Sequence, residues 1–379
     1  MRHLVMLAKS TWSPAIRREH ALATLARANG VGVDFVEAPA DIRRLRDRGT
    51  WTAGLRRVPP RRDSGPAIVY SRSTFVPGHR NAMATRLDNG LLRRTVETLC
   101  RQAAPADVAV VVNVPWQWGA TSGADARRVF DAADDWNLLL DGRRPHVREA
   151  YARIAAEADA IVVANPKLAA LFPGREVDLV PNGAQSDLVA GAGVRPSGTR
   201  RMVYIGTLSE RFDTALVTDV LTRLPDWTLD LYGEFRYAGH GDQPAPEFTR
   251  LLETFPGRVT WHGVLQRAEL GTVLDRAGVA LVPHRSRFSR GQSSMKFMDY
   301  AARGCPVVST RWEDDLERQA PPGVWFADTA DEFTGAVRDA DRNDAGTSRL
   351  ALAWAEEQTW ERRWPLWAGA VFDDVASAG

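Results

Sequence analysis

Short apolar runs alternate with amphipathic stretches along most of this chain. In the first half, the strand-like runs are Leu4–Ala8, Val33–Glu37, Ala67–Ser71, Val108–Val114, Arg128–Asp131, Ala160–Ala164 and Asp178–Val180. Helical periodicity, for example over Ala15–Ala28 and Leu91–Gln102, separates several of these runs. Because the strands are apolar on both faces and alternate with helices, the pattern predicts a parallel sheet that helices cover on both sides.

The same alternation restarts near residue 201. A turn signal at Pro181–Gly183 and a Gly-, Pro- and Ser-rich stretch at Gly191–Arg200 separate the two series. The strand-like runs of the second series are Arg201–Gly206, Thr228–Tyr232, Val259–Trp261, Val279–Pro283, Val307–Thr310 and Val324–Ala327. We therefore predict an α/β fold of two Rossmann-like, doubly wound domains, residues 1–184 and 185–359, that face each other across a ligand-binding cleft.

The C-terminal stretch Trp360–Val375 has an apolar helical pattern that includes several tryptophans. Such a face needs a partner surface. We expect a helix over residues 360–376 that packs back onto the first domain.

Composition narrows the class of protein. With 379 residues, 44% of them hydrophobic and 25% charged, the chain has the composition of a soluble enzyme. A net charge of +2 gives no broad positive field, so we expect no nucleic acid partner. Cys100 and Cys305 are the only cysteines, which excludes a disulfide framework and a zinc cluster. We expect a cytoplasmic protein, because no apolar run suits a signal peptide or a membrane span.

The most informative stretch runs from Ser289 to Thr310 and predicts a loop, a helix that ends at Gly304, and a buried strand. We expect Ser293 or Ser294 to cap the helix, which would leave its first N–H groups directed at an anion. Lys296 lies in the first turn, where its charge opposes the helix dipole unless an anion binds there. It is also one of only three lysines in a chain whose usual cation is arginine.

A nucleotide suits this helix. A diphosphate would bind the amides and Lys296, and Asp299, three residues further on the same face, would accept the ribose hydroxyls. An ordinary helix of an α/β domain is the alternative.

Other candidates follow strands of the second half. Gly206 ends a strand and allows close approach to its backbone, and Arg211 follows on the next loop, where it could bind the same diphosphate. Leu265 follows another strand, at the edge where a nucleobase could rest. The alternative for Arg211 is an ordinary surface arginine. The alternative for the residues that directly follow strands is a simple strand-to-helix turn.

At this point the residues resemble a known family. The second half is similar to the nucleotide-sugar domain of GT-B glycosyltransferases, especially family 4 and its relatives. The runs that carry the resemblance are Val203–Asp213, Val259–Leu265, Val279–Pro283 and Met295–Val308, with weaker ones at Val129–Trp136 and Val180–Gly183. It implies a GT-B fold, a nucleoside-diphosphate sugar as donor, retention of the anomeric configuration, and catalysis without a metal or other cofactor.

The resemblance also implies roles for individual residues. Asp299 matches the acidic residue that holds the donor ribose, and Ser294 and Met295 match positions whose amides contact the diphosphate. Arg211 and Lys296 match the cations that support the diphosphate and stabilise the leaving group.

The chain departs from the family pattern at two positions. Where many members carry a glutamate that contacts the donor sugar, this chain has Gly291, and Asp299 replaces the more usual glutamate. Arg290 and Gln292 are candidates for the missing hydrogen bonds to the donor, and Ser293 is a donor-binding candidate as a possible helix cap.

The first domain is expected to bind the acceptor and to hold any proton-transfer group. His79, on a polar loop, and Asp134, after a strand, are the candidates, although a loop histidine can simply be solvated. Four tryptophans follow strands or lie near strand ends and are candidates for an acceptor pocket that stacks a sugar or holds a quaternary ammonium: Trp12, Trp116, Trp118 and Trp136. The alternative for all four is packing between domains.

The sequence therefore predicts a metal-independent glycosyltransferase of the hexosyltransferase type, acting on a small-molecule acceptor of antibiotic or other specialised biosynthesis, cationic or thiol-bearing. One alternative is a lipid-linked acceptor of cell-envelope glycan assembly, with a membrane contact through the arginine-rich segment Arg43–Arg62. Another is a non-catalytic protein that binds nucleotide sugars. An NAD-dependent oxidoreductase is disfavoured, because no Gly-x-Gly-x-x-Gly follows a strand.

Overall fold

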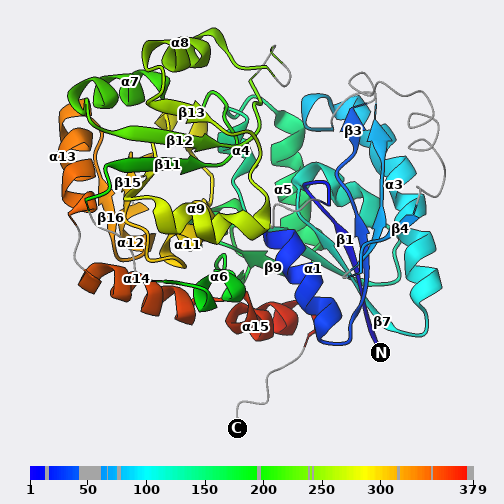
Figure 1. Cartoon of the computed structure of the whole chain (residues 1–379). Helices are drawn as coiled ribbons and strands as arrows, with labels where there is room; N and C mark the ends of the chain where they lie inside the picture. Colours follow the sequence, from blue (N-terminus) through cyan, green and yellow to red (C-terminus); the bar gives the residue numbers. More distant parts are fainter. Residues whose placement is uncertain are drawn as a thin grey trace. The chain divides into compact units, whose positions relative to one another are not determined.

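The computed structural model describes residues 1–12, 17–41, 61–65, 67–74, 78–193, 198–237, 240, 243–313, 316–342 and 345–373. The chain divides into two compact units (Figure 1). The first unit comprises the described residues within Met1–Asn182, Gly291–Ser293 and Trp360–Gly379, and the second those within Gly183–Arg290 and Ser294–Thr359. Residues 291–293 thus belong to the first unit, although their neighbours in the chain belong to the second.

The first unit contains a large sheet in the order β10-β9-β8-β7-β1-β2-β5-β4. Its strands are β1 (Arg2–Leu7), β2 (Gly32–Val36), β4 (Arg61–Asp63), β5 (Ile68–Tyr70), β7 (Asp107–Val112), β8 (Arg127–Ala132), β9 (Ala160–Val163) and β10 (Asp178–Leu179). Neighbouring strands pair in parallel, except for β4 with β5. Because β1 lies between β2 and β7, the strand order reverses there, which makes a switch point of the kind where doubly wound sheets bind ligands.

Helices and a small second sheet complete the first unit. The helices are α1 (Arg18–Ala28), η2 (Gly78–Arg80), α3 (Ala82–Ala103), η3 (Pro115–Thr121), α4 (Trp136–Leu139), α5 (Pro145–Glu157), η4 (Pro166–Leu171) and α15 (Trp360–Phe372). The small sheet pairs β3 (Ala40–Asp41) with β6 (Ser73–Thr74). The expected C-terminal helix is α15, which contacts α1, β7, β8 and β9 and buries Trp367 completely.

The second unit is a six-stranded parallel sheet in the order β13-β12-β11-β14-β15-β16. Its strands are β11 (Arg201–Ile205), β12 (Thr228–Tyr232), β13 (Val259–Trp261), β14 (Val279–Val282), β15 (Val307–Ser309) and β16 (Val324–Phe326). The strand order reverses between β11 and β14, so these two strands flank the switch point of this sheet.

Helices cover both faces of this sheet (Figure 1). On one face, α7 (Thr214–Arg223), α8 (Pro246–Thr254) and α13 (Ala330–Asp341) bury Leu221, Phe248 and Phe333. On the other, α9 (Leu270–Arg276) and α11 (Lys296–Ala301) bury Leu274 and Phe297. The remaining helices are α6 (Ser186–Ala190), η5 (Arg267–Glu269), α10 (Ser286–Ser289), α12 (Leu316–Gln319) and α14 (Ala345–Glu357).

The prediction of two parallel, doubly wound sheets is confirmed, and each predicted strand is present within about two residues of its expected ends. The helix expected at Leu91 begins nine residues earlier, at Ala82. Residues 43–60 of the arginine-rich segment lie outside the described residues; at its end, the Arg62 guanidinium donates to Glu37 Oε1 at 2.6 Å. None of the described helices is both long and apolar enough to cross a membrane.

Candidate functional site

Two residues mark the carboxyl ends of the strands at the switch point of the second unit, Gly206 after β11 and His284 just after β14. Gly206 has a φ of +150°, which side chains rarely tolerate. A Cβ atom at this position would overlap Cε of Lys296 and lie 2.8 Å from its Nζ. The glycine therefore allows the Lys296 side chain to lie directly against the backbone at the end of β11.

Lys296 and Arg211 come together at this strand end. Lys296 Nζ lies 5.5 Å from the centre of the Tyr204 ring, which faces the same region from β11. The Arg211 Nε atom donates to the Phe288 carbonyl at 3.0 Å, which orients its guanidinium. Both cations interact electrostatically with His284. Elements that are far apart in the sequence thus place two positive side chains at one strand end, as the sequence predicts.

His284 is a site residue that the sequence reading missed. Its side chain is buried, with 2% of the residue exposed, and neither ring nitrogen has a hydrogen-bond partner among the described residues. Burial, followed by the charges of Lys296 and Arg211, lowers the pKa of His284 well below its usual range. The imidazole is therefore neutral at pH 7. The available signal was its position directly after a predicted strand.

The start of α11 differs from the expectation. Met295 is the N-cap residue and no side chain caps the helix, so the prediction that Ser293 or Ser294 caps it is wrong. The Ser293 amide instead donates to Asp134 Oδ1 at 3.1 Å. The Ser294 hydroxyl is buried without a partner among the described residues. Gly304, with a φ of +57°, follows the end of the helix as predicted.

Asp299 lies in the first turn of α11. Burial raises the pKa of Asp299 to about 7, and the nearby charges of Arg267 and Lys296 oppose this shift. Arg267 is itself paired with Asp187, with 2.7 Å from Nη2 to each carboxylate oxygen. The carboxyl group of Asp299 therefore changes charge near neutral pH.

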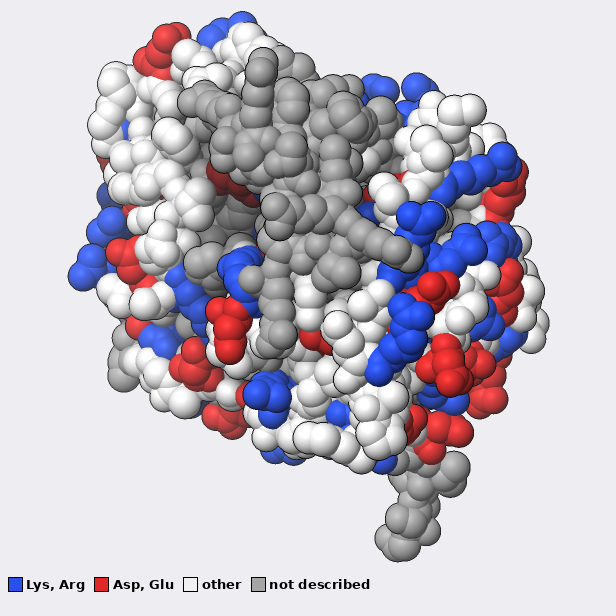
Figure 2. Space-filling model, turned by 90° about the vertical axis from the view of Figure 1, so that its right-hand side faces the viewer, with Lys and Arg blue, Asp and Glu red and all other residues white. Residues whose placement is uncertain are grey.

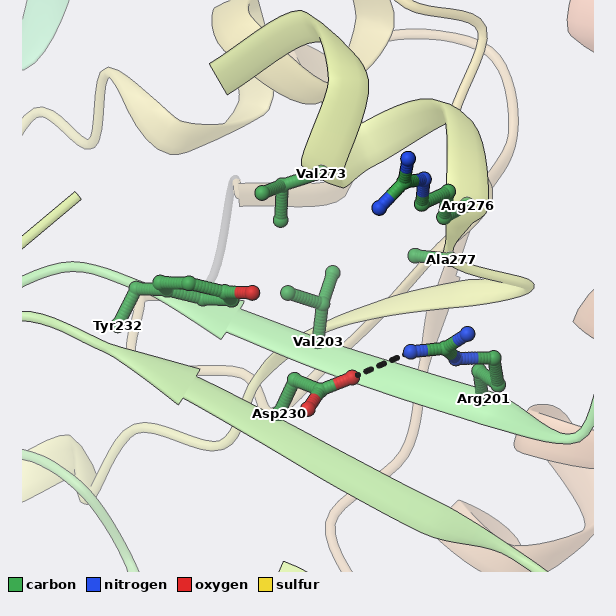
Figure 3. Close-up of a pocket in the computed structure, with 7 residues that line it drawn as sticks. All are labelled: Arg201, Val203, Asp230, Tyr232, Val273, Arg276 and Ala277. Atoms are coloured by element: carbon green, nitrogen blue, oxygen red, sulfur yellow. Dashed lines mark hydrogen bonds and ion pairs between the residues drawn. The ribbon is translucent and has the colours of Figure 1, made fainter. Parts of the chain in front are cut away.

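Leu265 lines an open cavity of about 410 Å³ between the ends of β12 and β13 and the helix α9. The cavity is also lined by Tyr232, His262, Val264, Ala268, Glu269, Thr272, Val273 and Arg276. The Tyr232 and His262 rings stack with their centres 4.7 Å apart. A smaller cavity of about 60 Å³ shares Tyr232, Val273 and Arg276, and Figure 3 shows it between these side chains and the Asp230–Arg201 ion pair.

In the first unit, Asp134 has two binding partners. Lys9 Nζ donates to its Oδ2 at 2.9 Å, and the Ser293 amide donates to its Oδ1. Burial by itself would lower the pKa of Lys9. The negative charges of Asp134 and Glu19 together have a larger effect, so the pKa of Lys9 is raised. Because both oxygens of Asp134 already accept hydrogen bonds, the geometry favours a role in holding residues 291–293 over a role as proton acceptor. The sequence reading missed Lys9.

Gly291 explains the departure from the family pattern. Its φ is +80°, and a Cβ atom there would lie 2.8 Å from the Asp135 carbonyl oxygen and 3.0 Å from Cβ of Leu138. The Asp135 amide donates to the Gly291 carbonyl at 2.7 Å. A glutamate side chain does not fit at this position. Of the candidates to replace it, Gln292 has a buried Oε1 without a partner among the described residues, and Arg290 is the C-cap residue of α10.

Three of the predicted acceptor residues form one aromatic cluster. The His79 and Trp116 ring centres are 5.3 Å apart, and those of Trp116 and Trp136 are 4.8 Å apart. Burial, followed by the charges of Arg80, Arg144 and His146, lowers the pKa of His79 to about 4. His79 is therefore neutral at pH 7 and lies in positive surroundings.

The other two predicted acceptor tryptophans lie elsewhere. Trp12 packs edge-to-face against His20 and Phe35, near the ends of β1 and β2. Trp118 is 1% exposed and packs against Phe130, with its indole N–H donating to Glu157. Trp118 is therefore a residue of the hydrophobic core, with no surface to offer an acceptor.

Within the part of the chain that the structure describes, no group of three or more His, Cys, Asp or Glu side chains is arranged to hold a metal ion. The absence of a metal from the reaction stays a prediction.

Comparisons with known proteins bear on the fold. A family model described as glycosyl transferase-like matches residues 211–367. Sucrose-phosphate synthase from Thermosynechococcus elongatus has a similar structure, with a TM-score of 0.72 and 14% identity over 100% of both chains. A UDP-forming α,α-trehalose-phosphate synthase from Burkholderia xenovorans is similar with a TM-score of 0.67 and 14% identity, over 97% of this chain and 99% of that one.

A lipopolysaccharide outer core galactosyltransferase, WaaB, matches with a TM-score of 0.61 and 13% identity, over 98% of this chain and 99% of that one. No curated protein matches the chain in sequence. These structures share the GT-B fold, so the predicted fold class is confirmed.

Proposed function

We propose that this protein, a glycosyltransferase with the GT-B fold, transfers a sugar from a nucleoside-diphosphate sugar to a small-molecule acceptor bound by its first unit. One observation carries the proposal: Lys296 lies against the backbone of Gly206 at the switch point of the second sheet, beside Arg211. Two cations at such a point are suited to a diphosphate, since ligands of doubly wound sheets bind where the strand order reverses.

The same cations would stabilise the reaction. When the sugar leaves, negative charge develops on the departing phosphate oxygen, and Lys296 and Arg211 are placed to neutralise it. We propose that the configuration at the sugar is retained, and that the departing phosphate oxygen takes the proton of the acceptor on the same face. The contacts of Asp134 support this route, because both of its oxygens already hold other groups of the first unit, the Lys9 ammonium and the Ser293 amide.

Asp299 is proposed to bind the ribose. A substitution of Asp299 should therefore change protein stability and nucleotide binding in opposite directions. Its raised pKa means that ionisation destabilises the folded state, so its contribution to stability falls as pH rises from the ordinary aspartate value of about 4 to about 7. We expect Asp299→Asn to raise the melting temperature at about pH 8, while it weakens nucleotide binding by about tenfold. Melting curves at about pH 8 and at about pH 5 check the sign, since the gain in stability should shrink at the lower pH.

The open cavity beside Leu265 is the proposed nucleobase pocket. It borders the carboxyl ends of β12 and β13, and its stacked Tyr232 and His262 rings provide an aromatic surface. The hydroxyl and charged groups of Thr272, Glu269 and Arg276 supply hydrogen-bond partners for base edges. The structural relatives named above include a UDP-forming synthase, which favours uridine among the bases to be tried first.

The aromatic cluster of His79, Trp116 and Trp136 is the proposed acceptor surface. The positive charges of Arg80 and Arg144 beside it would repel a quaternary ammonium, so the cluster suits a neutral or anionic acceptor better than a cationic one. A hydroxyl or thiol acceptor of specialised biosynthesis fits this requirement.

We expect Trp116→Ala to raise the KM for the acceptor by about five- to tenfold and to leave the KM for the donor unchanged, because the side chain contributes stacking area only. Trp325→Ala, a partly buried tryptophan of the second unit, serves as a matched control for general loss of packing. Equal acceptor kinetics in the wild type and Trp116→Ala would contradict the placement of the acceptor.

Transfer is proposed to need no metal, because Lys296 and Arg211 would neutralise the charge of the departing phosphate. We expect the rate to be unchanged after treatment with EDTA and dialysis. A rate that falls and then recovers on addition of Mg²⁺ or Mn²⁺ would contradict this.

A lipid-linked acceptor of cell-envelope glycan assembly is the second candidate. The structural similarity to a lipopolysaccharide galactosyltransferase favours it. A panel of UDP-, GDP-, ADP- and dTDP-sugars, assayed for donor hydrolysis and for transfer to soluble and to lipid-linked acceptors, tests both. Consumption of one donor supports the transferase assignment, whereas nucleotide binding without turnover of any donor would indicate a non-catalytic binding protein.

A further inference from the structure

The helix α3 exposes a row of apolar side chains that nothing in the proposed reaction requires. Met83, Leu87 and Leu91 are 71%, 68% and 44% exposed and follow one another at intervals of four residues. Residues at this spacing lie above one another on one side of a helix. Among the described residues, no other helix carries more than one exposed large apolar side chain.

The row is not part of the core. The opposite side of α3 buries Leu92, Val96 and Leu99 in the core of the first unit. The helix thus has two apolar faces, one that packs and one that faces solvent. Single exposed apolar residues are ordinary, but a contiguous exposed row marks an interaction surface.

The charges beside the row are mostly positive, and Glu97 is the one acidic side chain of α3 that is partly exposed. The exposed charged residues of α3 are Arg86, Arg93, Arg94 and Arg101, whereas Asp88 is buried against Arg72. In Figure 1, α3 lies on the right-hand side, and Figure 2 looks onto that side, where basic side chains (blue) are interspersed among uncharged and acidic ones. An arginine stem can lie along an apolar surface while its guanidinium binds an anion.

We propose that α3 docks this protein on an anionic lipid surface, with Met83, Leu87 and Leu91 in the acyl boundary and the arginines on the phosphate headgroups. Charge complementarity selects this occupant over a second copy of the chain, since the exposed arginines of two facing copies would repel each other. The docking is independent of the proposed transfer reaction, because α3 carries no residue proposed to bind donor or acceptor.

The test is co-sedimentation of the full chain with vesicles. We expect binding to vesicles of phosphatidylcholine with phosphatidylglycerol, and at least about tenfold weaker binding to phosphatidylcholine alone or at high salt. The triple variant Met83→Gln, Leu87→Gln and Leu91→Gln is expected to lose binding by at least about tenfold. Its melting temperature and nucleotide binding should match the wild type, because glutamine supports a helix and the replaced side chains are exposed.

Leu350→Gln, an exposed leucine of α14, is the matched control and should bind vesicles as the wild type does. Arg86→Gln with Arg93→Gln and Arg94→Gln should remove the preference for anionic lipid. The proposal is overturned if the wild type does not bind anionic vesicles, or if the triple apolar variant binds them equally well. It is also overturned if light scattering shows a dimer that the triple variant disperses, because the row would then bind a second copy.

Discussion

Lys296→Ala is expected to lower kcat by about a hundred- to a thousandfold, as does the loss of one group that stabilises the charge of a transition state. The reason is its position. The ammonium group lies at the end of β11, where only a glycine at position 206 leaves it room, and it shares this strand end with Arg211. Arg211→Ala should produce a loss of similar size, and neither change should alter acceptor binding.

The chain offers a matched control for this change. Lys167 is an exposed lysine of the first unit, in η4, and Lys167→Ala should leave kcat unchanged. Lys296→Ala must also fold, which its melting temperature would establish, since the lost contact with the Tyr204 ring contributes only about 1 kcal/mol. A folded Lys296→Ala enzyme with full kcat would remove Lys296 from the reaction.

Lys9→Met is expected to lower stability by about 2–4 kcal/mol, the largest effect on folding that we predict. The lysine and Asp134 are a mostly buried pair, with side chains 18% and 11% exposed and 2.9 Å between Nζ and Oδ2. Methionine fills the space of the lysine stem but leaves the Asp134 carboxylate buried without its cation. The melting temperature should fall by about 5–10 °C.

A second variant separates this explanation from simple misfolding. Adding Asp134→Asn to Lys9→Met removes the unpaired charge, so the double variant should recover part of the lost stability. The asparagine side-chain oxygen can still accept from the Ser293 amide, so the loop 291–293 should stay in place. If the double variant is less stable than Lys9→Met, the lysine contributes through packing and the charge-pair account is incorrect.

The sequence was sufficient for the strands and the topology. Runs such as Val279–Pro283 are apolar on both faces and end in Pro or Gly, which gives a strong local signal for a buried parallel strand. The position of Lys296 and Asp299 on one short helix was also predictable, because it depends on residues within one turn.

Local signals failed where contacts distant in the sequence decide the outcome. The local pattern predicts that Ser293 or Ser294 caps α11, but the Ser293 amide donates to Asp134, 159 residues away, and Met295 takes the cap position. The pairing of Lys9 could not be predicted either, since its partner Asp134 is 125 residues away. Nothing in the local sequence reports such pairs.

The predicted start of α3, at Leu91 instead of Ala82, is wrong for a different reason. The buried face of this helix consists largely of Leu92, Val96 and Leu99, so the core periodicity is clear only from Leu91 onward. The first three turns carry few buried apolar residues and are instead started by the Asn81 side chain, which accepts from the amides of Met83 and Ala84. The N-cap residue Asn81 is therefore the local signal that marks the observed start of α3, whereas the apolar periodicity is not.

Titration calorimetry with UDP, GDP, ADP and dTDP is the decisive measurement for the diphosphate site, because it measures diphosphate binding apart from catalysis. We expect the wild type to bind at least one of them, Lys296→Ala to bind it at least about tenfold more weakly, and Lys167→Ala to bind it as the wild type does. Failure of all four to bind, or equal affinity in the wild type and Lys296→Ala, would contradict the claim that the end of β11 is a diphosphate site.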